Sequence, residues 1–223
     1  MRIRRKKHLE ERVKNITEYL LQIDDSIKNV NEAVKVKDYF DTNKLYNNDN
    51  DVELEIGCGK GGFICEKARL NPSINHIAVE LLQNIIVMAC ELAKENNLKN
   101  VRFINTGAEY LPRYIKPNSI SNIYLNFSPP FPKDGYESRR LTSPRFVKSY
   151  HEFLKAGGKI IQKTDDVEFF EYSKLTLSQN GFCVKDLTEE YNSGKINSVI
   201  TEYESKFNKI GVKTNYLEAL VLK

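Results

Sequence analysis

The sequence predicts an α/β fold in which helices cover both faces of a mostly parallel, seven-stranded sheet. Segments with the patterns of strands and helices alternate from residue 52 to residue 221, and a glycine-rich turn follows the first of them. The composition, with 40% hydrophobic and 29% charged residues, is that of a globular domain. Alternating strand–helix units give parallel strands, and such sheets bind ligands at the carboxyl ends of their strands.

Each element follows from a local pattern. Short apolar or alternating runs, bounded by turn-forming residues, predict strands over residues 52–56, 76–79, 101–105, 120–127, 159–163, 183–187 and 214–221. Apolar residues at helical spacing predict helices over residues 63–70, 82–96, 144–154 and 167–180. The last two strands, near residues 183–187 and 214–221, belong to the tail of the chain.

The first 46 residues predict a basic arm with a helix, ahead of a single domain over residues 47–223. Mixed apolar spacing over residues 16–40 predicts the helix and a short connector. The basic character comes from Arg2, Arg4, Arg5, Lys6, Lys7, Arg12 and Lys14. Such an arm either grips phosphates or is a solvated terminus, and charge alone favours the second interpretation.

The composition argues against several classes of protein. The sequence has no run of about 18 apolar residues, so we expect no membrane span. The N-terminus also lacks the apolar stretch of a secretory signal. The four cysteines form no C-x-x-C pair and His8, His76 and His151 are scattered, so we expect neither a disulfide scaffold nor a metal site. We expect a cytoplasmic protein that binds no membrane and is a monomer or a weak homodimer.

A glycine-rich turn and an acidic residue indicate a cofactor that contains adenosine. Four glycines crowd residues 57–62 after the first strand, and Glu80 ends the second strand. Glycines let the backbone approach a ligand closely, and a following helix offers free N–H groups. An acid at the end of the second strand accepts hydrogen bonds from a ribose diol. The glycine spacing differs from the dinucleotide fingerprint G-x-G-x-x-G.

Residues 55–61, Glu-Ile-Gly-Cys-Gly-Lys-Gly, with Val-Glu at the second strand, resemble class I S-adenosylmethionine-dependent methyltransferases. The resemblance implies a Rossmann-like fold with S-adenosylmethionine as the methyl donor. It places Glu55 at the methionine end of the cofactor and Glu80 at the ribose. Without it, Glu55 is an exposed strand residue and Glu80 an acid near a helix dipole. The other cofactor contacts that we expect come from Gly57, Gly59, Gly107, Ala108 and Pro129.

Longer blocks make the resemblance more specific. The chain is similar to bacterial tRNA (guanine-N7-)-methyltransferases, in the order of that family and over nearly the whole chain. The blocks are Met1–Arg4, Glu55–Phe63, Tyr124–Ser128, Arg139–Thr142, Lys163–Asp165, Phe170–Ser173 and Thr201–Glu204. The resemblance implies methylation of guanine at position 46 in the tRNA variable loop. It implies substrate contacts from Lys133, Asp165, Thr201, Glu202, Tyr203 and Glu204, and we expect Arg139 and Arg140 to meet tRNA phosphates.

Three departures from the family pattern affect the expected site. The family has Asp-Pro-Trp after Asn-Phe-Ser, and that Asp is its proposed catalytic residue, whereas this chain has Pro129-Pro130-Phe131. A basic stretch after Pro-Lys is replaced by residues 134–136, Asp-Gly-Tyr. Gly107 stands where an acid is usual, so any cofactor contact there comes from its backbone.

The chemistry does not depend on the missing carboxylate as a base. Guanine N7 carries an in-plane lone pair and no proton, so transfer mainly needs alignment and exclusion of water. The product ring gains positive charge, which a nearby carboxylate stabilises. Asp165 and Glu204 are the candidates, and either also suits the guanine N1–H and 2-amino group. Asp165 is equally a candidate helix N-cap, and residues 201–207 equally form the end of an amphipathic helix.

Two alternatives remain at the level of the sequence. Residues 128–131, Ser-Pro-Pro-Phe, also look like the motif of amino-group methyltransferases, which act on N6 of adenine or N4 of cytosine. In that case Phe131 stacks on a flipped base, whereas otherwise it caps the core. The other alternative is a protein that binds tRNA or cofactor without turnover.

Overall fold

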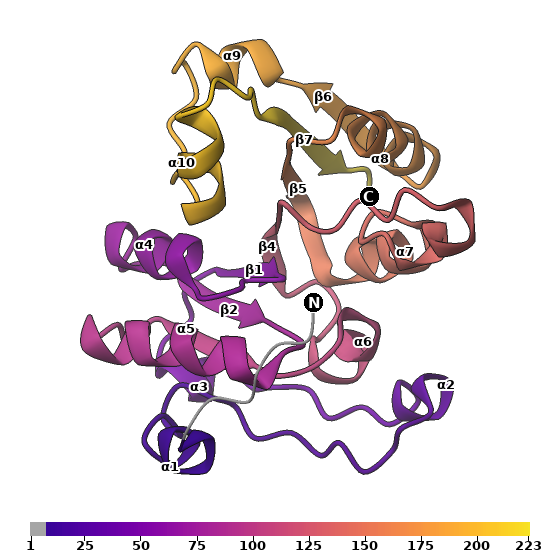
Figure 1. Cartoon of the computed structure of the whole chain (residues 1–223). Coiled ribbons are helices and arrows are strands. Elements are labelled where there is room, and N and C mark those ends of the chain that lie inside the picture. The colour runs from indigo at the N-terminus through magenta and orange to yellow at the C-terminus, as the bar shows by residue number, and fades with distance from the viewer. Residues whose placement is uncertain (1–7) are drawn as a thin grey trace. The chain divides into compact units, whose positions relative to one another are not determined.

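The computed structural model describes residues 8–223, which form two compact units that join between Tyr114 and Ile115 (Figure 1). The basic residues Arg2, Arg4, Arg5, Lys6 and Lys7, and the Met1–Arg4 block, lie outside the described residues. The strands are β1 Val52–Ile56, β2 Asn75–Val79, β3 Val101–Ile104, β4 Ile120–Asn126, β5 Leu154–Thr164, β6 Phe182–Asp186 and β7 Asn215–Val221.

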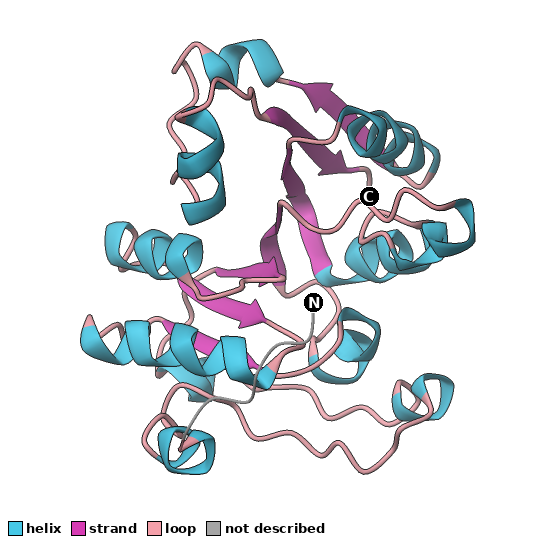
Figure 2. Cartoon of the chain, viewed as in Figure 1, coloured by secondary structure: helices cyan, strands magenta, loops and turns pink. Residues whose placement is uncertain are grey.

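Helices connect the strands in both units (Figure 2). The first unit contains α1 Leu9–Lys14, α2 Val30–Ala33, α3 Thr42–Tyr46, α4 Gly62–Leu70, α5 Gln83–Glu95, the 3-10 helix η1 Ala108–Tyr110 and α6 Leu111–Tyr114. The second contains the 3-10 helix η2 Asp134–Arg139, α7 Pro144–Phe153, α8 Val167–Gln179, α9 Thr188–Asn192 and α10 Glu202–Asn208. All seven strands and four helices that the sequence predicts after residue 47 are present, with ends shifted by a few residues.

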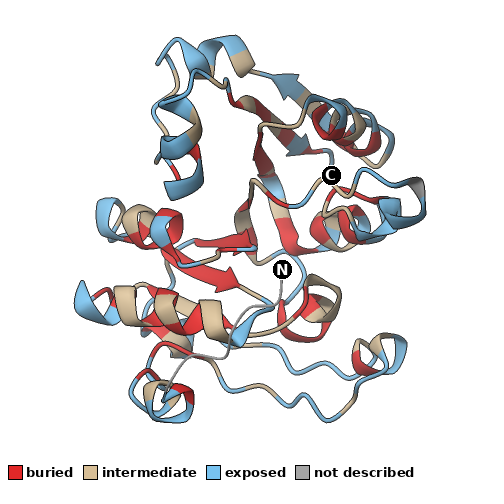
Figure 3. Ribbon diagram, in the orientation of Figure 1, coloured by how far each residue is buried: buried red, intermediate tan, exposed pale blue. Residues whose placement is uncertain are grey.

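In the first unit the strands lie in the order β3-β2-β1 and all are parallel. Leu54 lies beside Ile77, and Ala78 lies beside Phe103. Nearly every residue of these strands is buried, as Figure 3 shows in red, because helices and loops cover them. Burial includes the charged residues of β1, Glu53 and Glu55, which alternate with its apolar residues.

The second unit orders its strands β4-β5-β7-β6. β4 and β5 are parallel, whereas β7 runs antiparallel to both β5 and β6. A long connection containing α9 and α10 joins β6 to β7. Since β7 starts at the edge where β5 ends, this connection lies at the carboxyl end of β5, beside the residues that the sequence singled out there.

The predicted helix within residues 16–40 is mostly wrong, because only α2, Val30–Ala33, is helical there. Residues 20–29 form no helix, and Leu20 instead makes a parallel bridge to Phe103 of β3. The amide of Leu21 donates to the Phe103 carbonyl at 2.8 Å, and the Phe103 amide donates to the Tyr19 carbonyl at 2.9 Å. The apolar residues at helical spacing do not share one helix face. Ile16 and Tyr19 lie in the core, whereas Leu20 pairs with the sheet.

Several residues between positions 9 and 46 contact the remainder of the first unit. Arg12 donates to Glu91 of α5 at 2.6 Å, and the Tyr114 hydroxyl donates to the Asp24 carbonyl at 2.9 Å. Arg113, only 3% exposed, forms an ion pair with Asp24 at 2.9 Å. These residues are therefore an integral layer of this unit, and the division at residues 46 and 47 stays a prediction from composition.

Cys58, Cys65 and Cys90 are buried and Cys183 is exposed, and all four carry free thiols. Within residues 8–223, no helix is long and apolar enough to cross a membrane. No cluster of three metal-ligating side chains occurs in that same range.

A buried histidine in the first unit predicts pH-dependent stability. His76 on β2 is fully buried, 3.5 Å from Glu53, which also pairs with Lys67 at 3.3 Å. Burial lowers the pKa of His76 to about 4, with Glu53 opposing the shift and Lys67 adding to it. In the unfolded chain His76 is protonated below about pH 6.5, whereas in the folded chain it stays neutral down to about pH 4. The free energy of unfolding should therefore fall by about 2–3 kcal/mol as pH drops from 6.5 to 4.

Urea unfolding at a series of pH values measures this effect, with His76→Leu as the test variant and His8→Gln as the matched control. His8 is exposed, so its replacement should leave the slope of stability against pH unchanged. His76→Leu should flatten the slope between pH 6.5 and 4. An unaltered slope in His76→Leu would show that another group carries the dependence.

Candidate active site

The glycine-rich turn of the first unit is hydrogen-bonded to the end of β2. The amides of Gly57 and Cys58 both donate to the Val79 carbonyl, at 2.8 and 3.0 Å. Gly57 and Gly59 have φ values of +83° and +55°, which only glycine adopts without strain. A Cβ added to either would meet nothing within 4 Å. The turn therefore presents bare backbone to open space, as a site for close approach of a ligand requires.

Glu80 lies against this turn at the end of β2. Its carboxylate accepts hydrogen bonds from the amides of Gly59 at 3.2 Å and Leu82 at 2.9 Å. The Asn105 side chain fixes the local backbone by donating to the carbonyls of Glu80 at 2.8 Å and Leu81 at 3.0 Å. A carboxylate has about four acceptor positions, so Glu80 keeps capacity for the two hydroxyls of a ribose.

Glu55 lies on the other flank of the turn. It is 2% exposed on β1, so the alternative of an exposed strand residue is wrong. Burial raises the pKa of the Cys58 thiol well above its usual range, and the charges of Glu55 and Glu80 add to this shift. Both carboxylates are thus within electrostatic reach of one thiol in the turn. Bare backbone between two acids fits a ligand with a cationic end and a diol, as S-adenosylmethionine has.

The last two cofactor residues predicted in this unit follow β3. Gly107 is buried and precedes η1, which begins at Ala108. Gly107 has φ −78°, a value that any residue adopts. A Cβ there would come within 2.6 Å of the Glu109 carboxylate, a flexible group. The structure thus gives no steric need for glycine at position 107, and its cofactor contact stays a prediction.

A strained loop follows β4 in the second unit. Phe127 and Phe131 have φ values of +49° and +44°, a left-handed conformation that bulky residues rarely adopt. The Phe127 amide donates to the Lys163 carbonyl at 2.8 Å. Between the two phenylalanines, Ser128 is 7% exposed and its hydroxyl bonds to no described residue. Strain of this kind persists at functional sites, where the surroundings hold it in place.

Arg140 holds the far end of this loop. Its guanidinium donates from Nε to the Pro130 carbonyl at 2.9 Å and from Nη2 to the Phe131 carbonyl at 3.2 Å. It also lies over the Tyr172 ring, 4.4 Å from the centroid. The sequence predicted a phosphate contact for Arg140, but in this structure its donors fix the loop backbone.

Arg139 and Lys133 are exposed beside the same loop, as a role on tRNA phosphates requires. The Arg139 guanidinium lies 4.9 Å from the Phe131 ring centroid and 5.3 Å from that of Tyr136. Phe131 is therefore covered by a cation on its surface side. Base stacking by Phe131 stays a prediction.

Asp165 lies at the end of β5, and it is not the cap of the next helix. Asp166 is the N-cap of α8, because its carboxylate accepts a hydrogen bond from the Phe169 amide at 2.7 Å. The carboxylate of Asp165 points instead toward α10. Burial, followed by the charge and hydrogen bond of Asp165, raises the pKa of Tyr203. The N-cap interpretation of Asp165 is thus wrong by one residue.

Tyr203 of α10 joins the ends of β4 and β5. Its ring lies 5.0 Å from the Phe127 ring and stacks on Phe207 at 4.4 Å. Tyr203 itself is 45% exposed to solvent. The Phe127, Asp165 and Tyr203 blocks, far apart in the sequence, thus meet at one edge of this unit.

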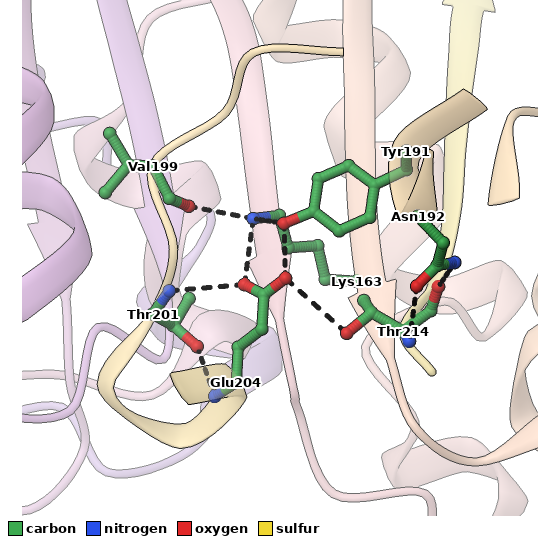
Figure 4. A network of polar contacts seen from close by, with 7 residues as sticks. All are labelled: Lys163, Tyr191, Asn192, Val199, Thr201, Glu204 and Thr214. Carbon is green, nitrogen blue, oxygen red and sulfur yellow. Dashed lines mark hydrogen bonds and ion pairs between the residues drawn. The ribbon is translucent and has the colours of Figure 1, made fainter. Parts of the chain in front are cut away.

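Thr201 and Glu204 form the start of α10. They make a capping box, since the Glu204 amide donates to Thr201 Oγ1 at 2.9 Å and the Thr201 amide donates to Glu204 Oε2 at 3.2 Å. Glu204 is 1% exposed and also pairs with Lys163 at 3.1 Å (Figure 4). Glu202 is exposed on the same turn. The helix interpretation of residues 201–207 is confirmed.

Comparison with known proteins defines the family. The sequence model of a family described as "Putative methyltransferase" matches residues 49–217. Two relatives carry the name tRNA (guanine-N(7)-)-methyltransferase. The protein from Geobacillus thermodenitrificans is 42% identical over 178 residues, 79% of this chain and 82% of its own. The protein from Clostridium tetani is 38% identical over 175 residues, 78% of this chain and 83% of its own. The chain belongs to the tRNA (guanine-N(7)-)-methyltransferase family.

Solved structures confirm the Rossmann-like methyltransferase fold predicted for this family member. The 16S rRNA methyltransferase KamB is 14% identical, with a TM-score of 0.57 that covers 91% of this chain and 96% of KamB. Geranyl diphosphate C-methyltransferase from Streptomyces coelicolor A3(2), in complex with S-adenosyl-L-homocysteine, is 17% identical, with a TM-score of 0.52, covering 78% of this chain and 73% of its own. At these identities the likeness concerns the fold alone.

Pro129 distinguishes this chain from the family pattern described above. It is exposed between Ser128 and Pro130, within the strained loop. A proline cannot supply a carboxylate, so this tRNA (guanine-N(7)-)-methyltransferase relative offers only its backbone at that position. Sequence reasoning also missed Lys163, which is 1% exposed, and Tyr191, its partner at 2.7 Å. A lysine ending a buried strand was the available signal, since lysine is rarely buried unless paired.

Proposed function

We propose that this chain transfers a methyl group from S-adenosylmethionine to N7 of guanine at position 46 in the variable loop of tRNA. The observation that carries the proposal is the meeting of three family blocks at the edge where β4 and β5 end. There Tyr203 touches Phe127 and interacts with Asp165. Asp166, by capping α8, leaves the Asp165 carboxylate to face this edge.

The cofactor is held by the first unit, with Glu55 at its methionine end and Glu80 at its ribose. The turn around Gly57 and Gly59 lets the cofactor approach the backbone, and the backbone of Gly107 and Ala108 borders the adenine. The backbone of Pro129 is a further predicted cofactor contact. S-adenosylmethionine supplies an electrophilic methyl group on its sulfonium sulfur.

The chain's own task in the reaction is placement. Guanine N7 attacks with a lone pair that carries no proton, so no residue acts as a general base. A bond forms from N7 to the methyl carbon, the carbon–sulfur bond breaks, and the positive charge passes from sulfur to the base. Asp165 accepts hydrogen bonds from the guanine N1–H and 2-amino group, and its charge stabilises the cationic product.

The tRNA backbone meets the exposed cations of the second unit. Lys133 and Arg139 are exposed beside the loop after β4, and Arg140 holds that loop from behind. Glu202 and Tyr203 form the base-binding face of α10, while Thr201 and Glu204, both buried, cap the helix. The protein works in the cytoplasm, where its substrate is, as a monomer or a weak homodimer.

A methyl-transfer assay with unmodified bulk tRNA and S-adenosylmethionine, followed by nucleoside analysis of the product, tests the proposal. We expect N7-methylguanosine. Methylated adenosine or cytidine would favour the amino-group reaction, to which the unbonded Ser128 hydroxyl is suited. Absence of product despite cofactor binding would favour a binding protein.

The missing carboxylate gives a second test of the same chemistry. Pro129→Asp restores the acid of the family pattern at an exposed position. Because the added charge stabilises the cationic product, we expect kcat to rise by up to about tenfold. A wild-type protein that is inactive and remains so with Pro129→Asp would argue against methyl transfer by this chain.

A further inference from the structure

A lysine that the proposed reaction does not use is buried at the end of β5. Lys163 is 1% exposed, and its backbone lies between Asn126 of β4 and Tyr216 of β7. Its ammonium donates to the Tyr191 hydroxyl at 2.7 Å, the Val199 carbonyl at 2.8 Å and Glu204 Oε2 at 3.1 Å (Figure 4). An ammonium has three donors, so these three partners satisfy it.

Both oxygens of the Glu204 carboxylate also accept hydrogen bonds inside the protein. One carboxylate oxygen accepts from Lys163 and from the Thr201 amide, while the other accepts from the Tyr191 hydroxyl and from Thr214 Oγ1 at 3.5 Å. The Tyr191 hydroxyl therefore links the cation and the anion directly. These contacts occupy the acceptor positions of the carboxylate.

The three residues to which the Lys163 ammonium donates come from the connection between β6 and β7. Tyr191 lies in α9, Val199 in the loop that follows, and Glu204 in the first turn of α10. The same turn carries Tyr203, which contacts Phe127, and whose pKa is raised by burial and then by the charge and hydrogen bond of Asp165. The Lys163 side chain thus binds three parts of this connection to β5, the strand that Asp165 follows.

We propose that Lys163 is a positioning residue, which holds α10 in the register that places Tyr203 against Phe127 and Asp165 for guanine binding. The inference rests on the proposed function. It assigns to Lys163 no contact with guanine or cofactor, because its donors are used inside the protein. Its effect on the reaction passes through Glu204 and the helix that Glu204 caps.

The charges indicate a role in register rather than in stability. A buried ion pair gains little over well-packed apolar residues of similar size, because both ions lose their hydration. Such a pair does, however, tolerate only one arrangement of its hydrogen bonds. A helix of seven residues, Glu202–Asn208, is too short to hold its own position. The Lys163 network supplies the fixed point that this helix lacks.

The test compares Lys163→Met and Tyr191→Phe with Tyr216→Phe as the matched control. Tyr191→Phe removes only the hydroxyl that links Lys163 to Glu204 and keeps the ring stacked on Tyr216 at 4.6 Å. The Tyr216 hydroxyl instead bonds Glu218 at 3.3 Å, outside the network. Tyr191→Phe also keeps both charges, so it remains informative if Lys163→Met does not fold.

We expect kcat/KM for unmodified tRNA to fall about 100-fold in Lys163→Met and about tenfold in Tyr191→Phe, mainly through KM. Affinity for S-adenosylhomocysteine should stay within about twofold, and Tyr216→Phe should behave as wild type. Backbone amides of residues 202–208 should exchange hydrogen faster in both variants, while those of β5 and β7 keep their protection.

Unchanged exchange in α10 together with unchanged KM in Tyr191→Phe would overturn the inference. So would an equal loss of tRNA and cofactor binding with a matching loss of thermal stability, because this is the result of a merely structural role. Hydrogen exchange reports on α10 without any methyl transfer. Failure of the proposed reaction is therefore distinguishable from failure of the role assigned to Lys163.

Discussion

An Asp165→Ala variant should lose about 100-fold in kcat/KM for N7-methylguanosine formation, while it stays folded and binds S-adenosylhomocysteine. The reason is that Asp165 is the carboxylate that faces the edge where Phe127 and Tyr203 meet, and it both holds the guanine and stabilises the charge that the ring gains. Steady-state kinetics with unmodified tRNA measures the loss.

The neighbouring acid provides the matched control. Asp166→Ala removes the N-cap of α8 and should lower the free energy of unfolding by about 1 kcal/mol. Its kcat/KM should remain that of the wild type, because its carboxylate is turned to the Phe169 amide. If both variants lost activity equally, or if Asp165→Ala lost none, the role given to Asp165 would be wrong.

A Gly61→Ala variant should lose about 3 kcal/mol of folding free energy. Gly61 has φ +81°, and a Cβ there would lie 2.7 Å from the Ala89 Cβ and 3.0 Å from its Cα. The first contact is with α5 itself, so the helix must move, and overpacking adds to the strain of a left-handed residue. A midpoint of thermal unfolding lower by about 10 °C would match this loss.

Two other glycines separate the causes. Gly194→Ala has a similar φ, +76°, with nothing within 4 Å of the new Cβ, so it should show the backbone strain alone, about 1 kcal/mol. Gly59→Ala should cost about the same stability and in addition weaken cofactor binding, because its Cβ projects from the turn. A Gly61→Ala variant no less stable than Gly194→Ala would refute the packing argument.

The fold after residue 47 was predictable because its signals are local. Apolar runs of strand length alternate with helical spacing, and the structure places every predicted strand of this region within a few residues. The segment from residue 16 to 40 was mispredicted for a physical reason. Leu20 is buried where it pairs with β3, and no window of sequence distinguishes that use from the face of a helix.

Site residues could be predicted from the sequence only where the residue type itself indicates a function, as with glycines in a turn or an acid at the end of a strand. Glu80 and the glycines of the turn were found from their order along the chain, and the structure brings them together. The Lys163 network joins β5 to residues 191–204, so nothing near Lys163 in the sequence indicates its partners. The choice between Asp165 and Asp166 as the N-cap depends on one hydrogen bond, and the left-handed Phe127 and Phe131 depend on contacts made by Lys163 and Arg140.

The pairing of Tyr19 and Leu21 with Phe103 has a practical consequence for handling the protein. An uncovered edge strand is a template on which other chains add strands, and proteins protect such edges against aggregation. Here a segment from the N-terminal region shields the outer side of β3. Truncations meant to remove basic charge should therefore stop before His8, because a cut beyond Leu21 would leave β3 open to self-association during expression and concentration.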